Sequence, residues 1–209
     1  QAMSSFQGKP LYAEAFVPFQ KELAVMVARD QQGNIATYPL TETIHERNIC
    51  IETLTPAAVD EKTAQQVALD VANHLEGAGV FGIEMFLTED NQILVNEIAP
   101  RVHNSGHYTI EACQTSQFEQ HIRAITGMEL GPTDMTVPAA VMVNILGERD
   151  GPVMLKGVEE AGAEPHTSVH IYGKSPTKID RKMGHITATG QTLEEARQRA
   201  HKAKEAISI

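Results

Sequence analysis

The stretch that most constrains this sequence is a pair of apolar runs, 81–87 and 93–98, separated by the polar residues 88–92. Two short apolar runs joined by a polar turn are typical of a β-hairpin. A turn centred on the Asp-Asn dipeptide brings together three opposed pairs: Leu87–Leu94, Met85–Asn96 and Glu84–Glu97.

The third pair places two carboxylates face to face. Opposed Cβ atoms on antiparallel strands lie roughly 5 Å apart, so Glu84 and Glu97 repel unless they share a proton, contact a basic side chain or bind a divalent cation. The polar loop 100–107 that follows contains Arg101 and two histidines, which suits a hard metal ion that holds a phosphorylated ligand. The alternative is an edge hairpin with two solvated glutamates. Each glutamate interrupts an apolar run, where an unpaired charge is costly to bury, so we favour the metal site.

The motifs in and after this hairpin resemble a known enzyme family. FGIEMF, VNEIAPR, HNSGHYTIEAC and TSQFEQH, between residues 81 and 121, are similar to the C-terminal portion of the N5-carboxyaminoimidazole ribonucleotide synthetases. These are ATP-grasp enzymes, also described as the ATPase subunit of aminoimidazole ribonucleotide (AIR) carboxylase. The likeness extends from Leu11 to His185. Most ATP-grasp proteins have Glu-x-Asn-Pro-Arg where this chain has Ala99 in place of Asn, a change that the resembled family shares.

The resemblance implies an ADP-forming ligase of purine biosynthesis. Such an enzyme uses ATP and bicarbonate to carboxylate 5-aminoimidazole ribonucleotide through carboxyphosphate. It implies Mg²⁺ or Mn²⁺ bound by Glu84 and Glu97, because phosphoryl transfer depends on charge neutralisation. The residues expected to orient bicarbonate and stabilise developing charge are Arg101, His103 and Asn104.

The resemblance also implies an ATP site near the N-terminal end of the sequence. The backbone of a strand containing Glu14, Ala15, Phe16 and Val17 is expected to meet the adenine, and Glu22 to hold the ribose hydroxyls. His45, Asn96 and Glu97 are expected to contact the nucleotide. Without the resemblance, Glu14 and Glu22 are better explained as solvated carboxylates and His45 as a surface residue.

A basic loop, 173–182, stands out in a protein with a formal net charge of −10. Arginine and lysine at such a loop suit a sugar phosphate, although a solvated loop explains them equally well from sequence alone. The resemblance favours substrate binding. The expected substrate contacts are Ser105, Lys174, Arg181 and Lys182.

The overall composition, with 42% hydrophobic residues in 209, indicates a globular protein. The negative charge disfavours nucleic-acid and anionic-membrane surfaces, and no apolar run approaches the ~20 residues of a membrane span. Cys50 and Cys113 match neither a zinc spacing nor a disulfide framework, so we expect a cytoplasmic protein.

The expected fold is α+β, with an ATP-grasp C-terminal subdomain over residues 1–131 and a small mixed α/β domain over 132–209. Strands are predicted at 11–17, 21–29, 35–40, 137–146, 168–172 and 183–188, with 41–56 as a polar connection. Amphipathic helices are predicted at 57–75, 109–126 and 192–207, with a short one within 153–162. The dipole of the helix at 109–126 is expected to favour an anion in the preceding loop, and its buried stripe to contain Ile110, Cys113, Phe118, Ile122 and Ile125.

The resemblance also has implications for the full-length protein. We expect the full-length protein to be a homodimer. The segments KELAVMV and ETIHE resemble those of fungal forms, in which this enzyme is fused to the carboxylase or mutase domain that acts next. The family's phosphate-binding lysines and Gly-rich loop are not found here, so the 209-residue chain alone is expected to be inactive. Two rival functions remain: another ATP-grasp carboxylate–amine ligase, and a non-catalytic interaction module derived from the fold.

Overall fold

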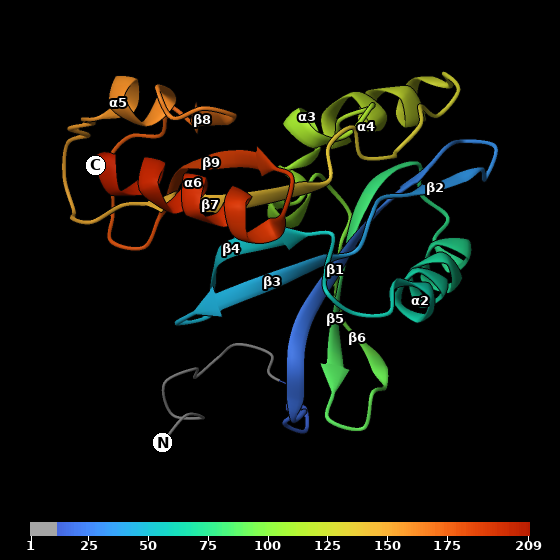
Figure 1. Cartoon of the computed structure of the whole chain (residues 1–209). Helices are drawn as coiled ribbons and strands as arrows, with labels where there is room; N and C mark the ends of the chain where they lie inside the picture. The colour runs from blue at the N-terminus through green and yellow to red at the C-terminus, as the bar shows by residue number, and fades with distance from the viewer. Residues whose placement is uncertain (1–11) are drawn as a thin grey trace.

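One antiparallel sheet of nine strands organises residues 12–209, the part of the chain that the computed structural model describes (Figure 1). Its strand order is β6-β5-β1-β3-β4-β7-β9-β8, and β2 pairs with β1 at the side of this path. The strands are β1 (Phe19–Arg29), β2 (Ile35–Thr37), β3 (Thr41–Glu46), β4 (Ile49–Thr55), β5 (Gly79–Thr88), β6 (Ile93–Ala99), β7 (Ala139–Leu146), β8 (Thr167–Ile171) and β9 (Lys182–Gly190). The helices are α2 (Glu61–His74), α3 (Thr109–Ala112), α4 (Gln117–Thr126), α5 (Val158–Gly162) and α6 (Leu193–Ala206), with a 3₁₀ turn, η1, at Asn104–Gly106.

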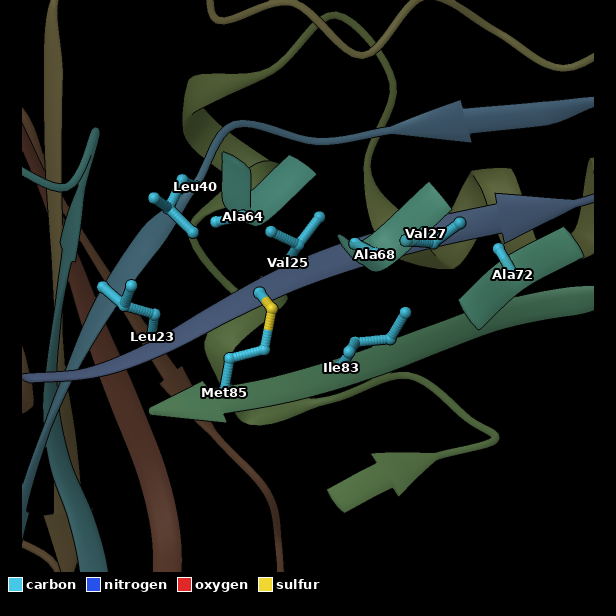
Figure 2. Packing of buried hydrophobic residues seen from close by; sticks show 9 residues of the cluster. All are labelled: Leu23, Val25, Val27, Leu40, Ala64, Ala68, Ala72, Ile83 and Met85. Atoms are coloured by element: carbon cyan, nitrogen blue, oxygen red, sulfur yellow. The ribbon is translucent and has the colours of Figure 1, made fainter. Parts of the chain in front are cut away.

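The first core lies between α2 and one face of β1 and β5. Alternate residues of a strand share a face, and residues four apart on a helix share a stripe. Figure 2 shows the resulting contact between two sets of side chains. The strands contribute Leu23, Val25, Val27, Ile83 and Met85, the connection before β3 contributes Leu40, and the helix contributes Ala64, Ala68 and Ala72. The intervening residues, including Glu22 on β1 and Glu84 on β5, therefore lie on the opposite face of the sheet, where the candidate site is found.

The second end of the sheet is covered by α6, which packs on β7 and β9 (Figure 1). Val141, Val143 and Ala188 meet Ala196 and Ala200 of the helix. Because β4 pairs directly with β7, the sheet continues across the predicted boundary at 131/132. The division into two domains at that position stays a prediction.

Several predicted elements are confirmed. The hairpin of β1 and β2 and the strands β7, β8 and β9 occur where sequence patterns placed them, as do α2, α5 and α6. Asp60 caps α2 and Thr192 caps α6, each through a side-chain oxygen that accepts a backbone N–H. The predicted antiparallel sheet with packing helices is therefore correct.

Two strand assignments in the N-terminal region were wrong. Residues 12–17 form no strand, and β1 begins at Phe19, after Pro18; Leu11 lies outside the described residues. Residues 41–56 are not a loop but the hairpin β3–β4 in the middle of the sheet. Their threonines misled the prediction because they are polar, yet β-branched residues fit strands well, and Arg47-Asn48 supply the positive φ angles of a two-residue turn.

The helix predicted over 109–126 is interrupted at 113–116. Cys113 pairs with Met135 in an isolated β-bridge, and Ser116 caps a new helix, α4. The predicted buried stripe was also wrong apart from Cys113, because Phe118 and Ile122 are 41% and 53% exposed. The side chains that α4 buries include two glutamines, Gln117 and Gln120. A four-residue α3 also lacks the long dipole that was expected to favour an anion in the loop.

Residues 12–209 contain no helix with the length and apolar character that crossing a membrane requires.

Gly157 provides a test of how the start of α5 packs against the end of α6. It precedes α5 with a φ of +77°, and an added Cβ would lie 1.8 Å from the carbonyl oxygen of Ala206. We expect Gly157→Ala to lower the free energy of unfolding by about 1–3 kcal/mol, measured by urea denaturation. The control is Gly162→Ala in the same helix, where a Cβ meets no atom within 4 Å. Equal stability of the two variants would contradict this packing.

Candidate metal and nucleotide site

The hairpin β5–β6 sets Glu84 opposite Glu97, as predicted. Beyond this pair, the register shifts by one residue, so Met85 pairs with Val95 and Leu87 pairs with Ile93. The predicted pairs Leu87–Leu94 and Met85–Asn96 were therefore wrong. Asn96 is the extra residue of a β-bulge. A one-residue slip exchanges the two faces of a strand, so the bulge brings Leu94 opposite Phe86, on the same face of the sheet as Glu84.

Glu84, Glu97 and His103 form a group whose possible ligand atoms all lie within 4.8 Å of one another. The Nε2 of His103 is 3.3 Å from Oε1 of Glu84. Burial raises the pKa of Glu84, and the Glu97 charge raises it further. Burial, Arg101 and Lys182 lower the pKa of His103 to about 4, so its imidazole is neutral at pH 7. Two repelling carboxylates beside a neutral imidazole are a donor set that fits a divalent cation.

The loop after β6 holds His103 in this position. The His103 Nδ1 lies 2.9 Å from Oγ of Ser105, and the ring packs over Gly82, where an added Cβ would be 2.7 Å from the His103 Cβ. Asn104 is buried, with its amide nitrogen 3.9 Å from Sγ of Cys50. Arg101 is exposed at the entrance to the loop. The structure thus brings the predicted catalytic residues into one loop beside the acidic pair.

Glu22 and His45 meet on the same face of the sheet. Glu22 on β1 pairs with Thr43 on β3, and its Oε2 lies 2.8 Å from Nδ1 of His45, two residues further along. Both side chains are close enough to Glu84 to influence its pKa. The predicted ribose-binding carboxylate and the predicted nucleotide-contacting histidine are therefore neighbours.

A cavity of about 470 Å³ lies at the far end of the hairpin. Its lining contains the predicted adenine-binding segment together with side chains of β1, β5 and β6. The lining residues are Glu14, Ala15, Phe16, Val17, Phe19, Phe86, Leu94, Val95 and Asn96. Phe19 and Phe86 stack with their ring centroids 4.7 Å apart. The segment 14–17 is irregular rather than a strand, with Glu14, Ala15 and Phe16 exposed and Val17 half-buried. Its contact with the adenine stays a prediction.

The basic loop lies on the neighbouring part of the sheet. Arg47, in the β3–β4 turn, contacts Asp180 at 2.6 Å and so connects the loop to the hairpin that carries His45. Nζ of Lys174 donates to the carbonyl of Lys182 at 2.7 Å, and Arg181 donates to the carbonyl of Pro176. Lys182 lies near enough to influence the pKa values of Glu84 and His103. Ser105, by contrast, is buried against His103, and its predicted substrate contact remains a prediction.

Sequence reasoning missed a stack of three histidines that joins the loop to β8 and β9. The rings of His107 and His170 each lie 4.5 Å from that of His185, centroid to centroid. The hydroxyl of Tyr172 is 2.8 Å from Nδ1 of His185, and Nε2 of His170 is 2.6 Å from a Glu111 oxygen. These residues are far apart in the sequence, and no local pattern signals their contact.

The stack predicts a loss of stability in acid. Burial first, then neighbouring charges, lowers the folded-state pKa of His107 to about 4 and of His185 to about 2, whereas an unfolded histidine titrates near ~6.5. The unfolded state therefore binds more protons below that value. We expect the free energy of unfolding to be highest above about pH 6.5 and to fall towards pH 4, by up to about 1.4 kcal/mol per pH unit for each histidine.

Urea denaturation at several pH values measures this slope. His107→Gln should reduce it by about one proton, whereas His74→Gln, on the exposed surface of α2, serves as the control. An unchanged slope in His107→Gln would contradict the prediction.

Comparison with known proteins places these features in a family. The ATP-grasp domain family matches residues 1–118, and the phosphoribosylaminoimidazole carboxylase C-terminal domain matches residues 140–199. This chain belongs to the ATP-grasp family. The predicted resemblance is confirmed, and so is the predicted fold class, in which an ATP-grasp segment is followed by a smaller C-terminal domain.

Individual relatives of this ATP-grasp chain agree with that assignment. A phosphoribosylaminoimidazole carboxylase from Ogataea methanolica is 47% identical over 208 residues, which cover 96% of this chain and 38% of the relative. An N5-carboxyaminoimidazole ribonucleotide synthase from Bacillus subtilis is 44% identical, with 93% of this chain and 51% of the relative covered.

Solved structures show the same fold. The N5-carboxyaminoimidazole synthase of Aspergillus clavatus, in complex with ADP and 5-aminoimidazole ribonucleotide, matches with a TM-score of 0.89 and 38% identity, over 98% of this chain and 56% of that one. The synthetase of Thermotoga maritima matches with a TM-score of 0.85 and 50% identity, over 93% and 54%. The ATP-grasp chain thus spans about half the length of these structures.

Proposed function

We propose that a full-length protein carrying this chain uses ATP and bicarbonate to carboxylate the exocyclic amine of 5-aminoimidazole ribonucleotide, with release of ADP and phosphate. The observation that carries the proposal is the opposed pair Glu84–Glu97 with His103 beside it, on the same sheet face as the Glu22–His45 pair. The names of the relatives support the choice of substrate.

In this proposal, Glu84 and Glu97 hold Mg²⁺ or Mn²⁺. When bound, the ion neutralises charge on the ATP phosphates. The chain itself supplies two acids on neighbouring rigid strands, with the His103 loop packed against them. Such a site is already shaped before the ligand binds, which lowers the cost of assembling it.

The nucleotide base is proposed to enter the cavity beside Phe86, Leu94 and the segment 14–17, and Asn96 and Glu97 to contact the nucleotide. Phe86 and Leu94 supply the apolar faces that a flat aromatic base requires. Glu22 accepts hydrogen bonds from the ribose hydroxyls, with Nδ1 of His45 2.8 Å from the same carboxylate.

Bicarbonate is proposed to lie beside Arg101 and His103. Arg101 contributes the positive charge, because His103 is neutral at pH 7 and can serve only as a hydrogen-bonding group. Asn104 points into the protein interior near Cys50, so its proposed help to bicarbonate is through the shape of the loop. The substrate phosphate is assigned to Lys174, Arg181 and Lys182, with Ser105 nearby. These cations provide the positive charge that a phosphate prefers.

The proposal is tested by steady-state ADP release from the full-length protein with Mg²⁺ present. ADP release that requires both bicarbonate and 5-aminoimidazole ribonucleotide supports it. Turnover with another carboxylate and amine would indicate a different ATP-grasp ligase. The absence of ATP turnover and of ATP binding would indicate a non-catalytic module.

We also propose that the full-length protein acts in the cytoplasm as a homodimer, and that it works with the carboxylase or mutase domain that consumes its product. The greater length of the Ogataea relative leaves room for such a fused domain. Gel filtration with light scattering tests the dimer.

A further inference from the structure

We propose that Gln117 is a positioning residue that fixes the two histidines of the loop 103–107; the proposal rests on the proposed function, in which His103 serves the reaction. Gln117 begins α4 and is fully buried at 0% exposure. No part of the proposed chemistry accounts for this buried amide.

The amide of Gln117 is fully used by the loop. Its Oε1 accepts the backbone N–H of His103 at 2.8 Å, and its Nε2 donates to the backbone carbonyl of the same residue at 2.8 Å. The Nε2 also lies 3.0 Å from Nδ1 of His107. The two backbone contacts determine the amide orientation, because the reverse orientation would place donor against donor and acceptor against acceptor. Nδ1 of His107 is therefore an acceptor, and its proton resides on Nε2.

The surroundings leave Gln117 little freedom. Its backbone N–H donates to Oγ1 of Thr109, whose hydroxyl donates to the carbonyl of Gly106 at 2.6 Å. An added Cβ at Gly106 would lie 2.6 Å from Oε1 of Gln117 and 2.7 Å from Cγ of Met26. The Gln117 amide thus packs tightly against Gly106, where a larger residue would displace it.

This arrangement affects both ends of the loop. At one end, His103 places Nε2 at 3.3 Å from Glu84, and a shift of its backbone would move that nitrogen relative to the acidic pair. At the other end, His107 stacks on His185 of β9, the strand that begins with Lys182. Gln117 therefore sets the position of His103 beside the acidic pair. It also sets the tautomer of His107, which contacts the strand that begins with Lys182.

The chain offers a matched control one helical turn away. Gln120 is also 0% exposed, and it makes the same paired contact with a single backbone unit: Nε2 donates to the Gly131 carbonyl and Oε1 accepts the Gly131 N–H, both at 2.8 Å. Gly131 lies outside the candidate site. Gln117→Met and Gln120→Met therefore remove the same pair of backbone hydrogen bonds at equal burial, and Gln117→Met also removes the contact with Nδ1 of His107.

The first experiment compares both variants in the full-length protein by steady-state kinetics and thermal unfolding. We expect a similar fall in Tm. Gln117→Met should lower kcat about 10- to 100-fold, with the KM for ATP changed less than about threefold, as outer residues that orient a ligand group typically do. Gln120→Met should keep kcat within about threefold. An equal loss of kcat in both variants, or full activity in Gln117→Met, would overturn the proposal.

The second experiment does not depend on the reaction. The imidazole ¹⁵N shifts of His107 and the affinity for Mn²⁺, measured by calorimetry with the metal alone, are compared in the same proteins. Gln117→Met should lose the His107 tautomer preference and bind Mn²⁺ more weakly, whereas Gln120→Met should match the wild type. If the wild type lacks bicarbonate-dependent turnover but these differences appear, the proposed function fails and the positioning role stands. Unchanged shifts and affinity in Gln117→Met would refute that role.

Discussion

Glu97→Gln is expected to lower ATP turnover by the full-length protein by about 1000-fold, because the substitution removes a full negative charge from the proposed cation site. Glu97 and Glu84 face each other across β5–β6, with His103 in the same group. Glutamine keeps the shape of the side chain and its oxygen acceptor. The measurement is kcat for ADP release at saturating ATP and Mg²⁺.

The same substitution should stabilise the protein slightly in the absence of metal. Like charges directly opposed on paired strands cost about 0.2–1 kcal/mol, so their removal raises the free energy of unfolding by that order. Glu97 also raises the pKa of Glu84, and that upward shift should shrink. Glu89→Gln, in the exposed turn of the same hairpin, is the control and should alter neither property. A variant that loses activity and stability together would indicate a structural role for Glu97 instead.

Arg197→Met is expected to destabilise the fold by about 3–5 kcal/mol, since it leaves a buried carboxylate without its principal partner. Glu52 on β4 is 2% exposed. It accepts two hydrogen bonds from Arg197 on α6, at 3.0 and 2.8 Å, and lies 2.8 Å from Nε2 of His201. Urea denaturation measures the loss.

Arg199→Met is the appropriate comparison, because Arg199 lies on the same helix and pairs with the more exposed Glu195 four residues earlier. A surface ion pair of this kind contributes under about 1 kcal/mol. If the two arginine variants had similar stability, the buried carboxylate would have found another partner, and the attachment of α6 to the middle of the sheet would not depend on Arg197.

The acidic pair illustrates what the sequence reveals about this site. Two apolar runs of strand length around a polar turn are a local signal, and each glutamate breaks its run, so the opposition of Glu84 and Glu97 was predictable and is confirmed. The bulge at Asn96 was not predictable, because an extra residue leaves no mark in the alternation of a seven-residue strand. Its effect is to place Leu94, rather than Val95, opposite Phe86.

Buried polar residues explain the larger errors. Hydrophobic periodicity predicts that the isoleucines and phenylalanine of a helix face the core. Instead, α4 buries Gln117 and Gln120, because each side-chain amide satisfies one backbone donor and one backbone acceptor. The β3–β4 hairpin was missed for the same reason, since its buried threonines resemble a loop when only polarity is considered. Such contacts depend on partners distant in the chain, as does the stack of His107, His170 and His185.

The pairing of β4 with β7 has a consequence for how this protein melts and moves. The two family segments, 1–118 and 140–199, share an uninterrupted ladder of hydrogen bonds, and Glu52 secures it to the last helix. The segments should therefore unfold in a single cooperative transition, visible as one calorimetric peak. The cavity at one end of the sheet and the cationic loop at the other are then held at a constant distance. Adjustment to a ligand therefore occurs through loops and side chains rather than through a hinge between the two segments.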